Sequence, residues 1–97
     1  MERGGYTYIL TNKYSTVFYV GVTSNLFSRM QEHKDFMHEG FTKRYGVTKL
    51  VYYEIFEHIE EAIEREKKLK AGTRAKKLAL ILKGNLEFND LTANLEY

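Results

Sequence analysis

Residues 6–10 read Y-T-Y-I-L, and residues 17–23 read V-F-Y-V-G-V-T. Both stretches consist mainly of β-branched and aromatic residues, which favour β-strands. The connection between them, over residues 12–16, is short and polar, so the two strands should pair as a hairpin. The sequence therefore predicts a β-hairpin at the start of the chain.

The residues that follow have helical spacing. Residues 23–25 (T-S-N) offer side chains that can cap a helix N-terminus. Positions on one helix face then recur at intervals of four, three and four residues: Leu26, Met30, His33 and Met37. We expect one helix here that ends near Gly40.

A third strand and two more helices are predicted after it. Residues 50–56 (L-V-Y-Y-E-I-F) form the most apolar segment and should be a strand. The next helix is marked by one stripe of positions: Ile59, Ala62, Ile63, Glu66 and Leu69. Gly72 is suited to end it in the left-handed conformation. Thr73 can cap a last helix over residues 74–83.

The element order β-β-α-β-α-α indicates an α+β fold, with a three-stranded antiparallel or mixed sheet and flanking helices. A chain of 97 residues is long enough for one domain. We expect that domain over residues 1–83 and a polar, loosely docked C-terminal tail over residues 84–97.

Composition excludes several classes of protein. The chain has no cysteine, which excludes a disulfide framework and a thiolate metal cluster and fits a reducing compartment. Neither a signal peptide nor an apolar run of the roughly 20 residues that span a bilayer is visible. We therefore expect a cytoplasmic protein without a membrane partner.

The net charge of +2 conceals an uneven distribution. Seven basic residues lie between Arg65 and Lys77, with Glu66 as the only acidic one. Such a cluster attracts polyanions, although a solvated helix face is the alternative. The residues expected to contact nucleic-acid phosphates are Lys67, Lys68, Lys70, Arg74, Lys76 and Lys77.

Glu66 is the first candidate for chemistry. At about 100° per residue it shares the apolar stripe of its helix. An ionised carboxylate on such a stripe is costly unless it is paired or binds a metal. The spacing alone leaves two interpretations open: a metal ligand, or an ion pair with a nearby Lys or Arg.

Arg29 and His33 form a second candidate pair. They stand one turn apart, so their side chains neighbour each other on one helix face. Arg is always charged and can hold a phosphate with two hydrogen bonds. A histidine on an apolar stripe is alternatively a core residue.

Tyr8 and Tyr19 lie on the two hairpin strands, where each could also be a packed core aromatic. Gly21 weakens its strand, and its presence indicates the close approach of another backbone or of a ligand.

Together these positions resemble the GIY-YIG nuclease family, and especially its small stand-alone bacterial members. The first motif appears as G-Y-T-Y-I-L at residues 5–10, and the second as Y-V-G at residues 19–21. The arginine and histidine fall in N-L-F-S-R-M-Q-E-H at residues 25–33, and the glutamate in E-E-A-I-E-R-E-K-K-L-K at residues 60–70. The resemblance covers about residues 5–82, and its order and spacing are specific.

The resemblance implies a metal-dependent endonuclease that hydrolyses phosphodiester bonds in DNA, in repair or recombination. The residues that it assigns to one catalytic site are Tyr8, Tyr19, Arg29, His33 and Glu66. Glu66 would hold one divalent cation, Mg²⁺ or Mn²⁺, and Arg29 would stabilise charge on the phosphoryl oxygens. The general base stays open among Tyr8, Tyr19 and His33.

Two departures from the family motif occur. Tyr6 replaces its first glycine, and Thr7 stands where an apolar residue is usual. No additional DNA-binding domain is visible, so the source of target specificity stays open, and a protein partner could supply it. The alternatives are a nucleic-acid-binding module with little or no catalysis, and a protein-interaction domain.

Overall fold

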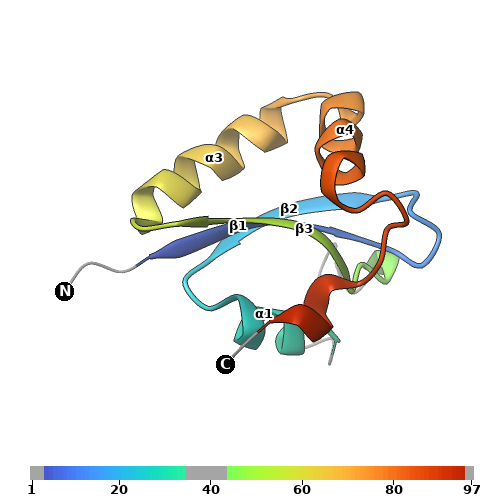
Figure 1. The fold of residues 1–97 in the computed structure, drawn as a ribbon, viewed down its shortest axis with the longest axis horizontal. Helices are drawn as coiled ribbons and strands as arrows, with labels where there is room; N and C mark the ends of the chain where they lie inside the picture. The colour runs from blue at the N-terminus through green and yellow to red at the C-terminus, as the bar shows by residue number, and fades with distance from the viewer. Residues whose placement is uncertain (1–3, 35–43, 96–97) are drawn as a thin grey trace.

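Three antiparallel strands form the centre of the molecule. The computed structural model describes residues 4–34 and 44–95 (Figure 1). Its strands are β1 (Gly5–Thr11), β2 (Phe18–Thr23) and β3 (Lys49–Phe56). They lie in the order β2-β1-β3, and both pairings are antiparallel. The predicted hairpin and third strand are confirmed, and the sheet is antiparallel rather than mixed.

Helices cover both faces of this sheet, so the molecule has three layers (Figure 1). α3 (Ile59–Ala71) and α4 (Arg74–Gly84) lie on one face, while α1 (Leu26–Lys34) and the short 3-10 helix η1 (Leu91–Asn94) lie on the other. The predicted order β-β-α-β-α-α is confirmed. Met37 and the expected helix end near Gly40 lie outside the described residues. In the part of the chain that the structure describes, no helix has the length and apolar character needed to span a membrane.

Alternating side chains of the central strand divide the core in two. Tyr8 and Leu10 face α1 and pack with Leu26 and Met30. Ile9, between them, faces the opposite layer. There it packs with the buried residues Val20, Val51, Leu69 and Ile81. Because both faces are covered, every residue from Thr7 to Thr11 is buried, which fixes the position of the Tyr8 side chain.

Local signals explain most of the helix ends. The Asn25 side chain accepts a hydrogen bond from the Ser28 amide at 3.1 Å, and the Thr73 hydroxyl oxygen accepts one from the Lys76 amide at 3.2 Å. The left-handed cap predicted for Gly72 is wrong. Gly72 is extended, with φ −77° and ψ 167°, and its amide donates to the carbonyls of Lys68 and Leu69.

The C-terminal segment is packed more closely than the sequence suggested. Asn85 is buried, and its amide nitrogen donates to the carbonyl oxygens of Val51 and Asn89. The Phe88 ring stacks on Phe18, with centroids 6.4 Å apart. The expectation of a loosely docked tail is therefore wrong for residues 85–95, because these contacts tie the tail to β3 and to the hairpin.

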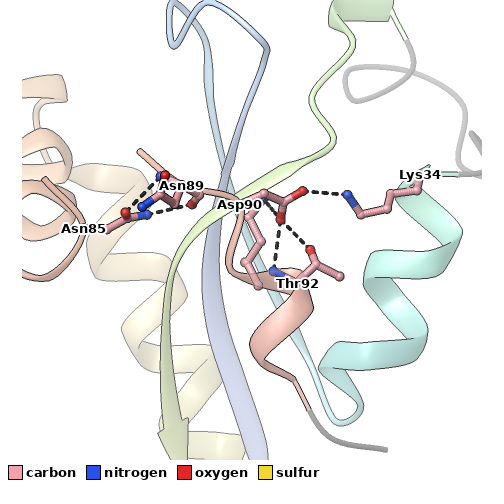
Figure 2. A network of polar contacts seen from close by, with 6 residues as sticks. Lys34, Asn85, Asn89, Asp90 and Thr92 are labelled. Atoms are coloured by element: carbon pink, nitrogen blue, oxygen red, sulfur yellow. Dashed lines mark hydrogen bonds and ion pairs between the residues drawn. The ribbon is translucent and has the colours of Figure 1, made fainter. Parts of the chain in front are cut away.

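Asp90 makes the second attachment of this segment. Its carboxylate accepts hydrogen bonds from Lys34 Nζ at 2.7 Å and from the Thr92 hydroxyl at 2.6 Å (Figure 2). It also accepts one from the Leu50 amide at 3.3 Å. One carboxylate thus connects α1, β3 and the start of η1.

Candidate active site

The hydroxyl of Tyr8 is the centre of the candidate site. Tyr8 on β1 pairs with Gly21 on β2, and its side chain is fully buried. A Cβ atom at Gly21 would lie 2.4 Å from both Cζ and the hydroxyl oxygen of Tyr8. The close approach expected at Gly21 is therefore that of the Tyr8 ring, and any larger residue would displace this ring.

His33 brings an imidazole to the same hydroxyl. It is 3% exposed, and its Nε2 lies 3.3 Å from the Tyr8 hydroxyl oxygen. Its ring meets those of Tyr8 and Tyr19 edge to face, with centroids 6.1 and 5.9 Å apart. His33 is thus both a core residue and a polar partner of Tyr8, which the sequence had presented as alternatives.

Arg29 reaches Tyr8 from one turn earlier on α1. Its positive charge and a hydrogen bond both act to lower the pKa of the Tyr8 phenol. Its Nε also lies 3.6 Å from Glu32 Oε2, and both side chains are about one-third exposed. Such an exposed ion pair contributes little stability, so the guanidinium can exchange it for a phosphate.

Glu66 approaches from the opposite layer. α3 and α1 lie on opposite faces of the sheet (Figure 1), yet the charge of Glu66 acts on Tyr8 and raises its pKa. The Glu66 side chain is 16% exposed and forms an ion pair with Lys70, with 3.3 Å between Oε2 and Nζ. The ion pair that the sequence left open is therefore present, and its lysine is 53% exposed.

The net effect on Tyr8 is a neutral phenol. Burial is the largest cause and raises the pKa of Tyr8 well above its usual range; Tyr19 and Glu66 add to the increase, and Arg29 opposes it. A phenol in this setting keeps its proton in neutral solution. It can donate that proton to His33 Nε2 while its oxygen accepts a hydrogen bond.

The carboxylate of Glu66 fits a hydrated divalent cation. Among the described residues, no group of three or more His, Asp or Glu side chains could enclose a metal ion. Mg²⁺ commonly takes only one or two carboxylates and keeps several waters. A single half-buried carboxylate whose lysine partner is exposed and able to move away suits such an ion.

Thr7 is a residue of the site region that the sequence did not identify. Its hydroxyl donates to the Ala62 carbonyl oxygen at 2.7 Å, and both residues are buried. In an α-helix this carbonyl also accepts from the amide four residues later, which is that of Glu66. Thr7 therefore attaches the turn of α3 that carries Glu66 to the central strand. A polar residue inside an apolar strand was the available signal.

The predicted basic residues differ in how freely they can bind. Lys67, Lys68 and Lys70 on α3 are exposed, as are Arg74 and Lys76 on α4. Arg74 also stacks over the Phe18 ring, 4.5 Å from its centroid, and donates to the Ser15 carbonyl oxygen. Lys77 is half-buried and donates to the Gly72 carbonyl oxygen at 2.9 Å.

A second polar cluster was not predicted and lies on the α3 face. The Arg65 guanidinium donates to both carboxylate oxygens of Glu54, at 3.1 to 3.2 Å, and Tyr52 donates to the same carboxylate. Burial and the Glu54 carboxylate raise the pKa of Tyr52 to about 12. Arg65 is therefore engaged within the fold, as are Lys70 through Glu66 and Lys77 through Gly72.

Comparison with protein families identifies the domain. The model of the GIY-YIG catalytic domain matches residues 4–79. A UPF0213 protein from Clostridium perfringens is 42% identical over 76 residues, which are 78% of this chain and 81% of that protein. A UPF0213 protein from Pediococcus pentosaceus is 30% identical over 89 residues, 92% of this chain and 93% of that protein.

A solved structure has the same fold. The solution structure of the UPF0213 protein from Bacillus halodurans superposes with a TM-score of 0.55 at 30% sequence identity. The match covers 88% of this chain and 92% of that chain. The names of these three relatives state no activity.

Proposed function

The chain belongs to the GIY-YIG catalytic-domain family, and on that premise we propose that it is a divalent-metal-dependent endonuclease that hydrolyses phosphodiester bonds in DNA. The observation that carries the proposal is the surroundings of the buried Tyr8 hydroxyl. His33 Nε2 lies 3.3 Å away, and the charges of Arg29 and Glu66 both act on the phenol. An imidazole beside the hydroxyl, together with a guanidinium and a carboxylate whose charges act on it, are groups that phosphodiester hydrolysis uses.

Tyr8 and His33 would activate the water together. Because burial raises the pKa of Tyr8, a free phenolate is not available as a base at neutral pH. Instead, the attacking water gives its proton to the Tyr8 oxygen while Tyr8 passes its own proton to His33 Nε2. The hydroxide formed attacks phosphorus, the bond to the leaving oxygen breaks, and this oxygen takes a proton from solvent. Tyr19 packs against the His33 ring and holds it in place.

Arg29 would stabilise the phosphate as negative charge accumulates on its oxygens. The guanidinium is about one-third exposed and can bind two phosphoryl oxygens at once. It replaces its surface contact with Glu32 when substrate arrives. A guanidinium placed where charge develops stabilises the transition state more than the ground state.

Glu66 is the residue that would hold the cation, Mg²⁺ or Mn²⁺. When bound, such an ion supplies Lewis acidity at the phosphoryl and leaving oxygens. Lys70 neutralises Glu66 at 3.3 Å and, being 53% exposed, can turn away to a backbone phosphate. Thr7 positions the Glu66 turn through the Ala62 carbonyl oxygen.

The substrate would be held through its backbone phosphates. Exposed lysines on α3 and α4 attract a polyanion without reading its sequence, so affinity should fall as salt rises. Target choice in repair or recombination would then come from the shape of the DNA or from a protein partner. Action on DNA fits the cytoplasmic location that the sequence predicts.

Cleavage assays with matched variants test the proposal. Labelled duplex, single-stranded, flap and junction DNA are incubated with protein at low salt, with Mg²⁺ or Mn²⁺ and with EDTA. Arg29→Ala and Glu66→Gln should each lower the cleavage rate by about 100-fold or more, because each removes a charge that acts on the transition state. Arg44→Ala and Glu61→Gln change exposed residues of the same types and should leave the rate within about twofold.

Two results would contradict the proposal. Cleavage that persists in EDTA, or that is equal in Glu66→Gln and Glu61→Gln, excludes a metal-dependent site at Glu66. No cleavage of any substrate excludes the endonuclease. Salt-sensitive DNA binding without cleavage would then favour a binding module, and the absence of both would favour a protein-interaction domain.

A further inference from the structure

A groove between α3 and α4 lies outside the Tyr8 site. It has a volume of about 500 Å³, within the usual range of ligand-binding clefts. Its basic rim consists of the exposed Lys68 on α3 and Lys76 and Lys83 on α4, and of the half-buried Lys77, which also donates to the Gly72 carbonyl oxygen. Leu69 is buried and Leu80 half-buried, so these two side chains form its floor. None of its lining residues, all of which the structure describes, is acidic.

Rim and floor suit different parts of a ligand. Lysine ammonium groups bind phosphates as point charges. The Leu69 and Leu80 side chains form an apolar floor that can accept a flat ring, and the exposed Ala79 and the glycine Gly72 are small enough to leave room beside them. Arg65 also borders the groove, but both carboxylate oxygens of Glu54 already hold its guanidinium. The groove therefore combines anion-binding cations with an apolar surface, as a nucleotide requires.

The rest of α3 points to a strand rather than a single nucleotide. At 100° per residue, Glu66 and the groove residue Lys68 lie on opposite flanks of the buried stripe that contains Ala62 and Leu69. Lys67 and Lys70 are exposed and continue the positive surface outside the groove. A ligand with several phosphates in a row can bind all of these lysines, whereas a mononucleotide can bind only those of the rim.

A base can enter the groove only when it is out of the duplex stack. We propose that the α3–α4 groove binds single-stranded nucleic acid, with one base on its apolar floor and the neighbouring phosphates on its lysines. This inference rests on the proposed function, since it makes the substrate of the Tyr8 site a DNA with a single-stranded arm. A flap or an overhang carries such an arm.

The test measures binding without cleavage. Fluorescent single-stranded and duplex DNA of equal length are titrated with the full chain in EDTA at low salt, and anisotropy gives each Kd. Ala79→Leu places a larger side chain in the groove without changing charge. It should raise the single-strand Kd about tenfold, the effect of losing one stacked base, and leave the duplex Kd within about twofold. Ala75→Leu, on the same helix but outside the groove lining, should change neither Kd.

A charge-reversal pair on α3 gives an independent measurement. Lys68→Glu removes a rim cation, and Lys67→Glu removes its exposed neighbour outside the groove. We expect Lys68→Glu to weaken single-strand binding more than duplex binding, and Lys67→Glu to weaken both by similar factors. In each variant the negative slope of log affinity against log salt should become shallower by about one.

Several outcomes would overturn the inference. One is an equal single-strand Kd for Ala79→Leu and Ala75→Leu. Another is a loss of duplex binding in Ala79→Leu as large as its loss of single-strand binding. If a mononucleotide displaces the labelled single strand as well as an unlabelled oligonucleotide does, at equal concentrations of nucleotide, the groove is instead a mononucleotide site. If Ala79→Leu cleaves DNA with unchanged substrate preference, the groove does not bind the single strand, but the endonuclease proposal stands. If the wild-type protein binds single strands in the groove but cleaves no DNA, only the endonuclease proposal fails.

Discussion

At Gly21, the space for a side chain is occupied by the ring of Tyr8 from the neighbouring strand. A Cβ atom there would lie 2.4 Å from the Tyr8 hydroxyl oxygen, and the Tyr8 side chain is fully buried. We expect Gly21→Ala to lower the free energy of unfolding by about 1 to 3 kcal/mol, the usual cost of overpacking a core. Urea unfolding followed by circular dichroism measures it.

Gly84 provides the matched control for this substitution. A Cβ atom at Gly84, the last residue of α4, would have no heavy atom within 4 Å. Gly84→Ala should therefore leave stability unchanged or raise it by about 0.5 to 1 kcal/mol, because alanine loses less backbone freedom on folding. Equal stabilities of the two variants would show that Tyr8 does not need the space at Gly21.

Tyr8 should also determine how stability responds to alkali. An unfolded tyrosine ionises near pH 10, whereas burial raises the pKa of folded Tyr8 well above that value. The contribution of this buried phenol is thus fully present below about pH 10 and is lost as pH rises further. Tyr8→Phe lacks the ionisable group, so its unfolding free energy should fall less than that of the wild type between about pH 9 and 11.

The comparison for Tyr8→Phe is Tyr14→Phe, which changes a tyrosine that is 74% exposed. Tyr14→Phe should follow the wild-type curve over the same pH range. Some alkaline loss will remain in Tyr8→Phe, because the pKa of Tyr52 is also raised, to about 12, by burial and by Glu54. Identical curves for all three proteins would refute the role given to Tyr8.

Among the elements, the connection from α4 to η1 depends on one carboxylate. Burial acts to raise the pKa of Asp90, but hydrogen bonds from Lys34 and Thr92 outweigh it and hold the pKa below its usual range. Its stabilising contribution is therefore present above about pH 4 and is lost as pH falls through the lower folded pKa. Asp90→Asn should be less stable than the wild type by about 1 kcal/mol at pH 7, and this difference should shrink as pH falls below about 4.

The control for Asp90 is Glu87→Gln, which removes a negative charge from an exposed residue of the same segment. It should leave stability within about 0.5 kcal/mol at both pH values. Thermal unfolding at pH 3 and pH 7 measures the difference. If Asp90→Asn is less stable than the wild type by the same amount at both pH values, the charge of Asp90 does not hold the segment in place.

Elements with strong periodic patterns could be predicted from the sequence, and those that depend on distant contacts could not. The strands and α3 agree with the prediction to within about two residues. The end of α3 was predicted in the wrong conformation, because Gly72 feeds directly into the Thr73 cap of α4 and stays extended there. Ile63, assigned to the buried stripe, lies at its border and is 36% exposed.

The same distinction applies to the site. Helical spacing predicted that Arg29 and His33 are neighbours, and it placed Glu66 on the apolar stripe of its helix. It could not place α1 and α3 on opposite faces of the sheet (Figure 1), nor show that the Tyr8 ring fills the space over Gly21. The Thr7 bond to Ala62 joins residues 55 apart in sequence, which no local pattern reveals.

For the whole molecule, the three layers make the candidate site depend on the integrity of the sheet. Arg29 comes from the layer below and Glu66 from the layer above, and both act on a hydroxyl held by the central strand (Figure 1). A shift of either helix relative to β1 would separate these groups. Packing and hydrogen-bond contacts between the layers are therefore important for the proposed activity as well as for stability.

The C-terminal segment makes several such contacts, and truncation after Gly84 tests their importance. The segment stacks Phe88 on Phe18 and places Leu91 and Leu95 against the core beneath the sheet. Its Asn85 and Asp90 hydrogen-bond to Val51 and Leu50 of β3. Its removal would expose these apolar contacts and break these hydrogen bonds, so the free energy of unfolding should fall by roughly 2 kcal/mol or more.

We therefore expect the chain of residues 1–84 to unfold at a lower urea concentration than the full chain, with a smaller m-value because less surface is exposed on unfolding. The double variant Leu86→Ser and Glu87→Ser, at exposed positions of the same segment, should match the full chain. If residues 1–84 are as stable as the whole, the domain ends at residue 83 as the sequence suggested. If they are less stable, the domain includes the segment, because its side chains complete both the lower core and the edge of β3.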